Sequence, residues 1–260
     1  MTILDRIISE KRRTLSNLAY SGNSRRNGTT RSLLKQLEKN KPVIIAEFKR
    51  ASPSKGIINN LLQPDEQACL YERFGADAMS VLTDTPFFKG NFTDLTTVFD
   101  AVSLPLLCKD FIIDERQIVY AKNHGATVIL LIVAALTKDQ LKQLFHFAIN
   151  EGLEVLVEVH NKAEAERAIE LGAEIIGVNN RDLHTFGVDL QVTESLAPLI
   201  KESGAFLISE SGLKTGEDVA RVINAGADGI LVGEALMKSE NLELLMRQMK
   251  KTQNLAGGSK

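Results

Sequence analysis

Residues 124–132 read HGATVILLI, a glycine behind a helix-like segment followed by an apolar run that is typical of a buried strand. The same plan recurs in FGADAMSVL at 74–82, LGAEIIGV at 171–178 and AGADGILV at 225–232. Each glycine suits the left-handed position that ends a helix, and each apolar run then indicates a strand. The repeated unit is therefore helix, glycine, strand.

The repeat predicts eight strands in all. EGLEVLVEV at 151–159 is a looser fifth copy, and VIIAEF at 43–48, LPLLCKDF at 104–111 and FLISES at 206–211 are further runs of strand type. Asp114, Thr137 and Thr215 suit the N-cap position of the segments that they open. The helical patterns that follow or separate the strands cover 64–74, 92–102, 114–123, 137–150, 161–171, 190–203, 215–225 and 241–251.

This alternation indicates the fold class. Strands that alternate with helices and are apolar nearly throughout belong to a parallel sheet covered on its outer face. Eight such units in about 250 residues match an α/β fold, a single closed (β/α)8 TIM barrel. We prefer it to a doubly wound open sheet, because no dinucleotide fingerprint follows the first strand. The predicted organisation is a helical extension at 1–40 packed on the barrel, the barrel at 41–252 and a flexible tail at 253–260, one domain overall.

The extension begins with an amphipathic segment. ILDRIISEKRRTLSNL at 3–18 has apolar residues at 4, 7, 8, 15 and 18, so we expect an extra helix lying against the barrel. We interpret its basic cluster, Lys11 to Arg13, as a solvated helix face in preference to a nucleic-acid patch. The segment at 21–31 is predicted to be a mobile linker, and LAGGSK at 255–260 a frayed tail.

Composition excludes several classes of partner. The chain is 44% hydrophobic and 25% charged, as in soluble globular proteins, and its net charge of −2 gives no reason to expect nucleic acid or a membrane surface. The longest apolar stretch, 126–136, is shorter than the roughly 20 residues of a membrane span. With no signal-peptide pattern at the start, we expect a cytoplasmic protein. Cys69 and Cys108 have neither metal nor disulfide spacing, so both are predicted core thiols, and we expect no metal or cofactor.

Polar side chains stand where the predicted strands end, which in this fold is where the reaction site is built. Glu47 and Lys49 are two apart and therefore share a face of the first strand. We expect them to meet Lys109 and Glu158 in one pocket, although for any single residue an ordinary rim salt bridge remains the alternative. The strand-end residues are Glu47, Lys49, Thr83, Asp84, Lys109, Asp110, Glu158, Asn179, Asn180, Arg181, Glu210, Ser211, Gly233 and Glu234.

Two other signals concern the ligand. SESGLKTGED at 209–218 and ILVGEALM at 230–237 each place a glycine at a strand end before a helix start, where backbone N–H groups can receive a phosphate. Chain reversal is the alternative role for these glycines. Aromatic residues after the second and third strands, either packed in the core or covering a flat ring, are Phe87, Phe88, Phe92 and Phe111.

Taken together these motifs resemble a known family. AEFKRASPSKG at 46–56, LLCKDF at 106–111, VEVH at 157–160, GVNNRDL at 177–183, SESGL at 209–213 and LVGEALM at 231–237 are similar, in order and spacing, to indole-3-glycerol phosphate synthase of tryptophan biosynthesis. The resemblance covers residues 3–250. It implies a carboxy-lyase that closes 1-(2-carboxyphenylamino)-1-deoxyribulose 5-phosphate to an indole, with loss of CO2 and water.

The resemblance also implies roles for individual residues. Lys109 is the expected general acid, Glu158 the general base or the counter-charge to a cationic intermediate, and Lys49 the group that holds the substrate carboxylate and lies beside Lys109 as a second cation. The other expected catalytic residues are Glu47, Asn179 and Ser211. The expected substrate-binding residues are Ser52, Phe88, Phe111, Leu131, Arg181 and Glu210. The expected phosphate-binding residues are Ser52, Gly212, Gly233 and, through its backbone only, Glu234, which stands where the family pattern has Ser or Thr.

Two other functions remain open from the sequence. A phosphosugar isomerase such as phosphoribosylanthranilate isomerase shares the barrel and the phosphate site, but it leaves the trio of Glu47, Lys49 and Lys109 unexplained. A non-catalytic barrel that binds a phosphorylated metabolite would show binding without turnover. In every case the expected partner is a small phosphorylated molecule, and we expect a monofunctional monomer.

Overall fold

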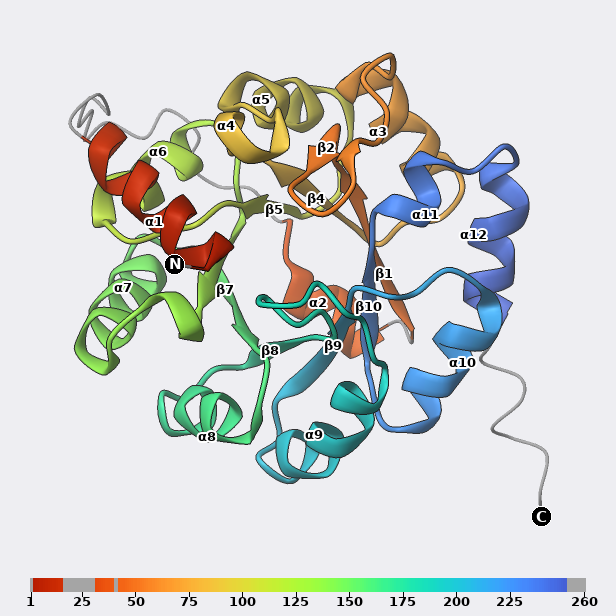
Figure 1. The fold of residues 1–260 in the computed structure, drawn as a ribbon. Helices are drawn as coiled ribbons and strands as arrows, with labels where there is room; N and C mark the ends of the chain where they lie inside the picture. Colours follow the sequence, from red (N-terminus) through yellow and green to blue (C-terminus); the bar gives the residue numbers. More distant parts are fainter. Residues whose placement is uncertain (1, 16–30, 40–41, 252–260) are drawn as a thin grey trace.

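The computed structural model describes residues 2–15, 31–39 and 42–251, and its centre is a closed barrel of eight parallel strands. Each strand pairs with the next along the chain, and β1 closes the ring by pairing with both β10 and β4 (Figure 1). The predicted (β/α)8 barrel is thus confirmed. The barrel strands are β1 (Val43–Phe48), β4 (Ala78–Leu82), β5 (Leu106–Lys109), β6 (Val128–Ile132), β7 (Glu154–Val159), β8 (Ile175–Asn179), β9 (Phe206–Glu210) and β10 (Gly229–Val232).

Eight helices surround the strands, and each agrees with its predicted range to within one residue at either end. Asp114, Thr137 and Thr215 act as the N-caps that the sequence predicts, since each side chain accepts a backbone N–H of the first turn. The eight helices are α3 (Pro64–Arg73), α5 (Phe92–Ala101), α6 (Glu115–Asn123), α7 (Lys138–Asn150), α8 (Lys162–Glu170), α9 (Gln191–Glu202), α10 (Gly216–Asn224) and α12 (Leu242–Lys250).

Two apolar layers follow from the alternation of side chains along the strands. Val43 and Ile45 of β1 point into the barrel, whereas Ile44 and Ala46 point outward to the helices. The inner layer also contains Leu107 of β5 and the corresponding residues of the other strands. Because the alternation continues to the strand ends, it determines which polar residues reach the space above the inner layer.

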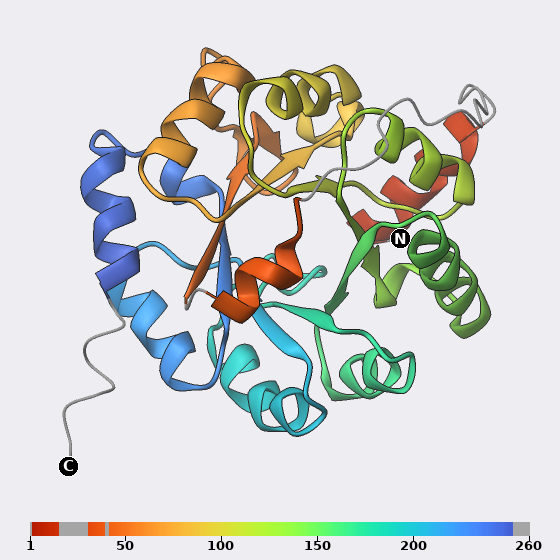
Figure 2. The ribbon, with the colours of Figure 1, turned by 180° about the vertical axis from the view of Figure 1, so that it is seen from behind.

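The amino-terminal end of the barrel is closed by α2 (Leu33–Lys39), which the sequence did not predict. Leu33 and Leu37 are fully buried in the inner apolar layer. The backbone N–H of Leu33 donates to the Glu154 carboxylate at the start of β7, at 2.7 Å. Seen from behind, α2 lies across the centre of the ring (Figure 2).

The opposite end is flanked by α1 (Ile3–Thr14), the predicted amino-terminal helix. Its Lys11 Nζ lies 2.9 Å from Asp84 Oδ2 and 2.5 Å from Asp110 Oδ1, and both carboxylates are buried. The interpretation of Lys11 as part of a solvated face was therefore wrong. Three parts of the predictions lie outside the described residues. They are residues 16–18 of the predicted helix, 21–30 of the predicted linker and the predicted tail at 253–260.

Short elements in the loops account for most of the other differences. The unpredicted ones are the hairpin β2 (Ala51–Ser52) and β3 (Gly56–Ile57), the short helices α4 (Thr85–Phe88) and α11 (Glu234–Met237), and the 3-10 turn η2 (Val133–Ala135). Cys108 is buried as predicted, and burial raises the pKa of its thiol to about 12, but Cys69 is exposed on α3, so that prediction was wrong. No helix in the described ranges is long and apolar enough to cross a membrane.

Candidate functional site

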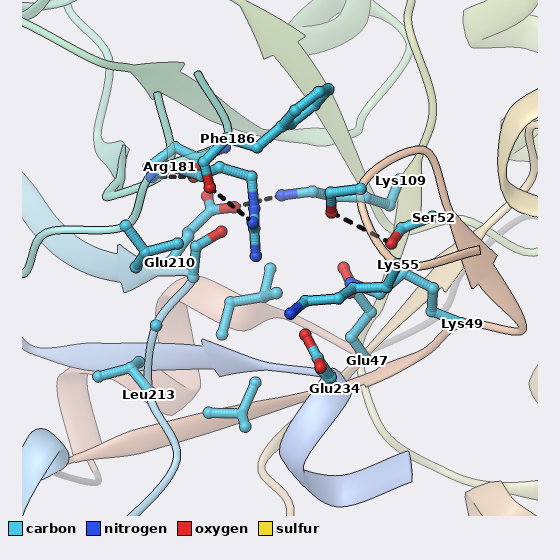
Figure 3. A pocket seen from close by; sticks show the side chains of 18 of the residues that line it. Glu47, Lys49, Ser52, Lys55, Lys109, Arg181, Phe186, Glu210, Leu213 and Glu234 are labelled. Carbon is cyan, nitrogen blue, oxygen red and sulfur yellow. Dashed lines mark hydrogen bonds and ion pairs between the residues drawn. The ribbon is translucent and has the colours of Figure 1, made fainter. Parts of the chain in front are cut away.

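A cavity of about 890 Å³ opens at the carboxyl ends of the strands. Side chains from β1, β5, β9 and the loop after β8 surround one space (Figure 3). The structure brings nearly all of the predicted site residues to this cavity. Those that line it are Glu47, Lys49, Ser52, Phe88, Lys109, Phe111, Glu158, Asn179, Arg181, Glu210, Ser211, Gly212, Gly233 and Glu234.

The charged residues reach the cavity because they continue the inward phase of their strands. Glu47 lies two residues beyond the inward Ile45, and Lys109 two beyond the inward Leu107. By the same spacing Glu158 follows Leu156, and Glu210 follows Ile208. The polar set is therefore an extra inward layer above the apolar core.

Lys109 is the centre of this layer. Its ammonium group contacts the carboxylate of Glu210 and lies 3.2 Å from Glu158 Oε2. Asn179 donates from Nδ2 to the other oxygen of Glu158, at 3.1 Å. One cation thus serves two buried carboxylates that come from different strands.

The electrostatics of Lys109 differ from the prediction. Burial alone lowers its pKa, but the carboxylates of Glu210, Glu158 and Glu47 outweigh burial, so the pKa of Lys109 is raised. The resemblance implied Lys49 as a second cation beside Lys109. In the structure Lys49 is ion-paired with Glu47, and the charged groups in contact with Lys109 are the carboxylates of Glu158 and Glu210. Lys109 is therefore a stably protonated donor in the free protein.

The two carboxylates beside Lys109 have opposite titration behaviour. Burial raises the pKa of Glu210 to about 7; Lys109 opposes this rise, and the neighbouring Glu158 adds to it by less than Lys109 removes. Burial also acts on Glu158, but Lys109, His160 and Asn179 outweigh it and lower its pKa. Glu158 is consequently the carboxylate that stays ionised, whereas Glu210 exchanges a proton near neutral pH.

Glycines make room for these carboxylates. A Cβ at Gly233 would lie 2.5 Å from Glu47 Oε1, and one at Gly177 would lie 2.2 Å from Glu210 Oε1. At the end of β9, Ser211 has φ of +66°, a left-handed conformation that costs energy for a residue with a side chain. Gly177 was missed from the sequence, although a glycine inside a strand is a sign of close approach.

One side of the cavity carries the predicted phosphate-binding residues. Ser52, Gly212 and Gly233 line it, and the cationic side chains of Lys55 and Lys214 line it as well. Glu234 Oε1 lies 2.9 Å from Lys238 Nζ, and this lysine, against the effect of burial, lowers the pKa of Glu234. The carboxylate that the sequence places beside the predicted phosphate site is therefore already paired.

The other side is apolar. The rings of Phe88 and Phe111 face each other with their centroids 5.9 Å apart. Ile3, Leu4 and Ile7 of α1 extend this wall. With these three residues, α1 becomes part of the cavity and not only a support for the barrel.

Leu131 is the one predicted site residue that the structure places elsewhere. It is fully buried in the outer layer, between β6 and the helices, and does not line the cavity. Its neighbours Leu130 and Ile132 point inward and line it instead. Successive side chains of a strand point to opposite faces, so a shift of one residue selects the wrong face.

The loop after β8 supplies cavity residues that the sequence analysis missed. Leu183, Phe186 and Val188 line the cavity from this loop. A bridge between Arg181 and Val188 closes it, and Arg181 donates from Nη1 to the Phe186 carbonyl at 3.2 Å. Three apolar residues in an otherwise polar loop were the available signal.

The comparisons with known proteins agree with this geometry. The family model described as indole-3-glycerol phosphate synthase matches residues 4–249. Proteins named indole-3-glycerol phosphate synthase from Bacillus cereus (strain AH820) and Bacillus thuringiensis subsp. konkukian (strain 97-27) are each 50% identical over 250 residues, 96% of this chain and 98% of the relative. The chain therefore belongs to the indole-3-glycerol phosphate synthase family.

Proposed function

We propose that the chain converts 1-(2-carboxyphenylamino)-1-deoxyribulose 5-phosphate to indole-3-glycerol phosphate, CO2 and water. The observation that carries the proposal is the position of Lys109, held by Glu158 and Glu210 in a cavity that has an apolar wall on one side. The substrate has the matching halves, an aromatic ring with a carboxylate and a sugar chain with a phosphate. Membership of the family supports the same reaction.

In the first step Lys109 acts as the general acid. The ring carbon that bears the carboxylate attacks the ketone carbon, a carbon–carbon bond forms, and the ketone oxygen takes a proton from Lys109 to become a hydroxyl. Positive charge then spreads from the ring to the nitrogen. Glu210 contacts Lys109 and exchanges a proton near neutral pH, so it can return the proton that Lys109 has given.

The second and third steps remove CO2 and water. The bond to the carboxylate breaks, and its electron pair restores the aromatic ring. The hydroxyl then leaves as water while the neighbouring CH2 group loses a proton. Glu158 stabilises the cationic intermediate and accepts this proton, because its pKa is lowered and it remains an anion.

Lys49 and the polar rim orient the substrate in this proposal. Lys49 exchanges part of its contact with Glu47 for the substrate carboxylate. Asn179 and Ser211, together with Glu47, orient the sugar hydroxyls and the nitrogen. The phosphate lies against Ser52 and the backbone of Gly212, Gly233 and Glu234, and the pairing of Glu234 with Lys238 favours a backbone contact only.

A product assay tests the proposal. The purified chain is incubated with the carboxyphenylamino substrate while indole absorbance and released CO2 are followed together. Equal amounts of indole product and CO2 are expected. A rearranged sugar phosphate without CO2 would favour the isomerase, and ligand binding without turnover would favour the non-catalytic barrel.

A further inference from the structure

His160 directly follows β7, two residues after Glu158 on the chain. The ring lies outside the cavity lining, with its side chain only 13% exposed. Its Nδ1 lies 3.1 Å from Glu164 Oε2 in α8, and its Nε2 lies 3.4 Å from Glu158 Oε1. The imidazole therefore stands between two carboxylates, one structural and one in the proposed site.

The contacts of Glu164 determine where the protons lie. Glu164 Oε2 accepts the backbone N–H of His160 at 2.8 Å, and Oε1 accepts from Asn161 at 2.7 Å. A carboxylate can only accept, so Nδ1 of His160 carries a proton. In a neutral ring Nε2 would then turn a lone pair toward Glu158, and the lone pair and the carboxylate would repel each other. A second proton, on Nε2, replaces this repulsion by attraction.

The surroundings of Nε2 favour a charged ring through proximity to a carboxylate. Nε2 is buried and makes no hydrogen bond among the residues that the structure describes, but Glu158 Oε1 lies 3.4 Å from it. Burial lowers the pKa of His160, but Glu164 and Glu158 outweigh it, so the pKa lies above the ordinary value. The other charged groups of this cluster are Lys109 on β5 and Glu210 on β9.

The charge balance of the site shows what a protonated His160 ring would do. Lys109 is shared between Glu158 and Glu210, so a single ammonium group faces two buried carboxylates. A buried carboxylate without enough positive charge takes up a proton, and Glu158 protonated could neither act as a base nor face a cation. A second cation behind Glu158 keeps it ionised and leaves Lys109 closer to Glu210.

We infer that His160 is a positioning residue whose protonated ring holds the Glu158 carboxylate ionised and turned toward Asn179, and that Glu164 holds that ring. His160 does not touch the substrate and acts only through Glu158. Its effect on turnover rests on the proposed function, whereas its charge does not.

The charge is tested in the free protein by following the histidine ring protons by NMR as a function of pH. The chain has four histidines, and the His160→Gln variant assigns the signal. His160 is expected to titrate above the ordinary value of about 6.5, and to titrate about one pH unit lower in Glu158→Gln and in Glu164→Gln. A titration at or below the ordinary value, or one that neither substitution moves, would overturn the inference whatever the protein catalyses.

The effect on the site is tested by pH profiles. In His160→Gln we expect kcat to fall about tenfold with KM within about twofold. Without the cation the pKa of Glu158 rises, so the acid limb of the kcat profile should move to higher pH by about half a unit or more. His146→Gln, on the exposed face of α7, is the matched control. A His160→Gln profile that coincides with that of the control would reject the positioning role.

Discussion

The two ends of the barrel both bury carboxylates, but they hold them in different ways. At the amino-terminal end, Asp77 accepts the backbone N–H of Ile44, and Asp228 accepts the backbone N–H of Leu207, each at 2.9 Å. At the carboxyl end, Glu158 and Glu210 share the ammonium group of Lys109 and face a cavity.

This difference shows that burial of a charge does not by itself indicate a catalytic role. A backbone N–H holds a carboxylate in a fixed position and joins two strands, which serves the fold. A lysine that shares its charge between two acids can transfer a proton and change partners, which serves chemistry. Because Asp228 also pairs with Lys201 and Asp77 with Lys250, a lysine partner alone does not mark a site. The sharing of one lysine by two acids, and access to a cavity, separate the two cases.

A large effect is expected at the cavity end from Glu158→Gln. The amide keeps the shape but provides neither a base nor a negative charge, so kcat should fall by about three orders of magnitude with little change in Tm. Steady-state kinetics and thermal unfolding of the same sample measure both. If the kcat of Glu158→Gln stays within about tenfold of the wild type, Glu158 serves the fold alone, as Asp77 and Asp228 do at the amino-terminal end.

Two leucine variants in β6 test the distinction between the inner and outer faces of the barrel. Leu131→Ala removes a side chain from the outer layer and should destabilise the protein by about 3 kcal/mol without changing KM. Leu130→Ala opens the cavity and should raise KM for the substrate. Denaturant unfolding and kinetics on both variants compare them. A larger KM effect from Leu131 than from Leu130 would contradict the assignment of faces.

At the amino-terminal end, Asp228→Ala should affect stability alone. It leaves the backbone N–H of Leu207 buried without this acceptor, which costs about 2 kcal/mol of unfolding free energy. The kcat and KM of the folded protein should match the wild type at a temperature well below Tm. A loss of kcat with unchanged stability would show that the division between the two ends fails.

The smallest of these effects is expected for Lys49→Ala. Loss of the ammonium that pairs with Glu47 should raise KM for the carboxylated substrate about tenfold and change kcat less. Lys138→Ala, an exposed ion-paired lysine on α7, is the control. An unchanged KM would reject the role of Lys49 as the carboxylate clamp.

The sequence predicted the barrel and most of the cavity because both follow from local patterns. Polar residues at strand ends mark their own face, so Glu47 and Lys109 could be placed together. The strand at 128–132 is apolar on both faces and carries no such mark, so Leu131 was chosen where Leu130 reaches the cavity. α2 escaped prediction since only two leucines of a short polar segment enter the core.

Partners across the barrel could not be predicted from local patterns. Lys11 was interpreted as solvated because its acids, Asp84 and Asp110, follow strands that lie far from it in the chain. The same limit explains the error over Lys109, whose neighbours proved to be acids and not Lys49. Long-range pairing determines charge states, and the tertiary structure was needed to see it.

The most direct test compares two lysine–carboxylate pairs, one at each end of the barrel. Lys109→Met removes the ammonium that contacts Glu210, and Lys201→Met removes the one that lies 2.5 Å from Asp228 Oδ2. The measurement is kcat for indole formation by both variants. For Lys109→Met we predict that kcat falls by about three orders of magnitude or more, while substrate affinity stays within about tenfold of the wild type. For Lys201→Met we predict that kcat changes by no more than about twofold. Near wild-type turnover in Lys109→Met would contradict the account.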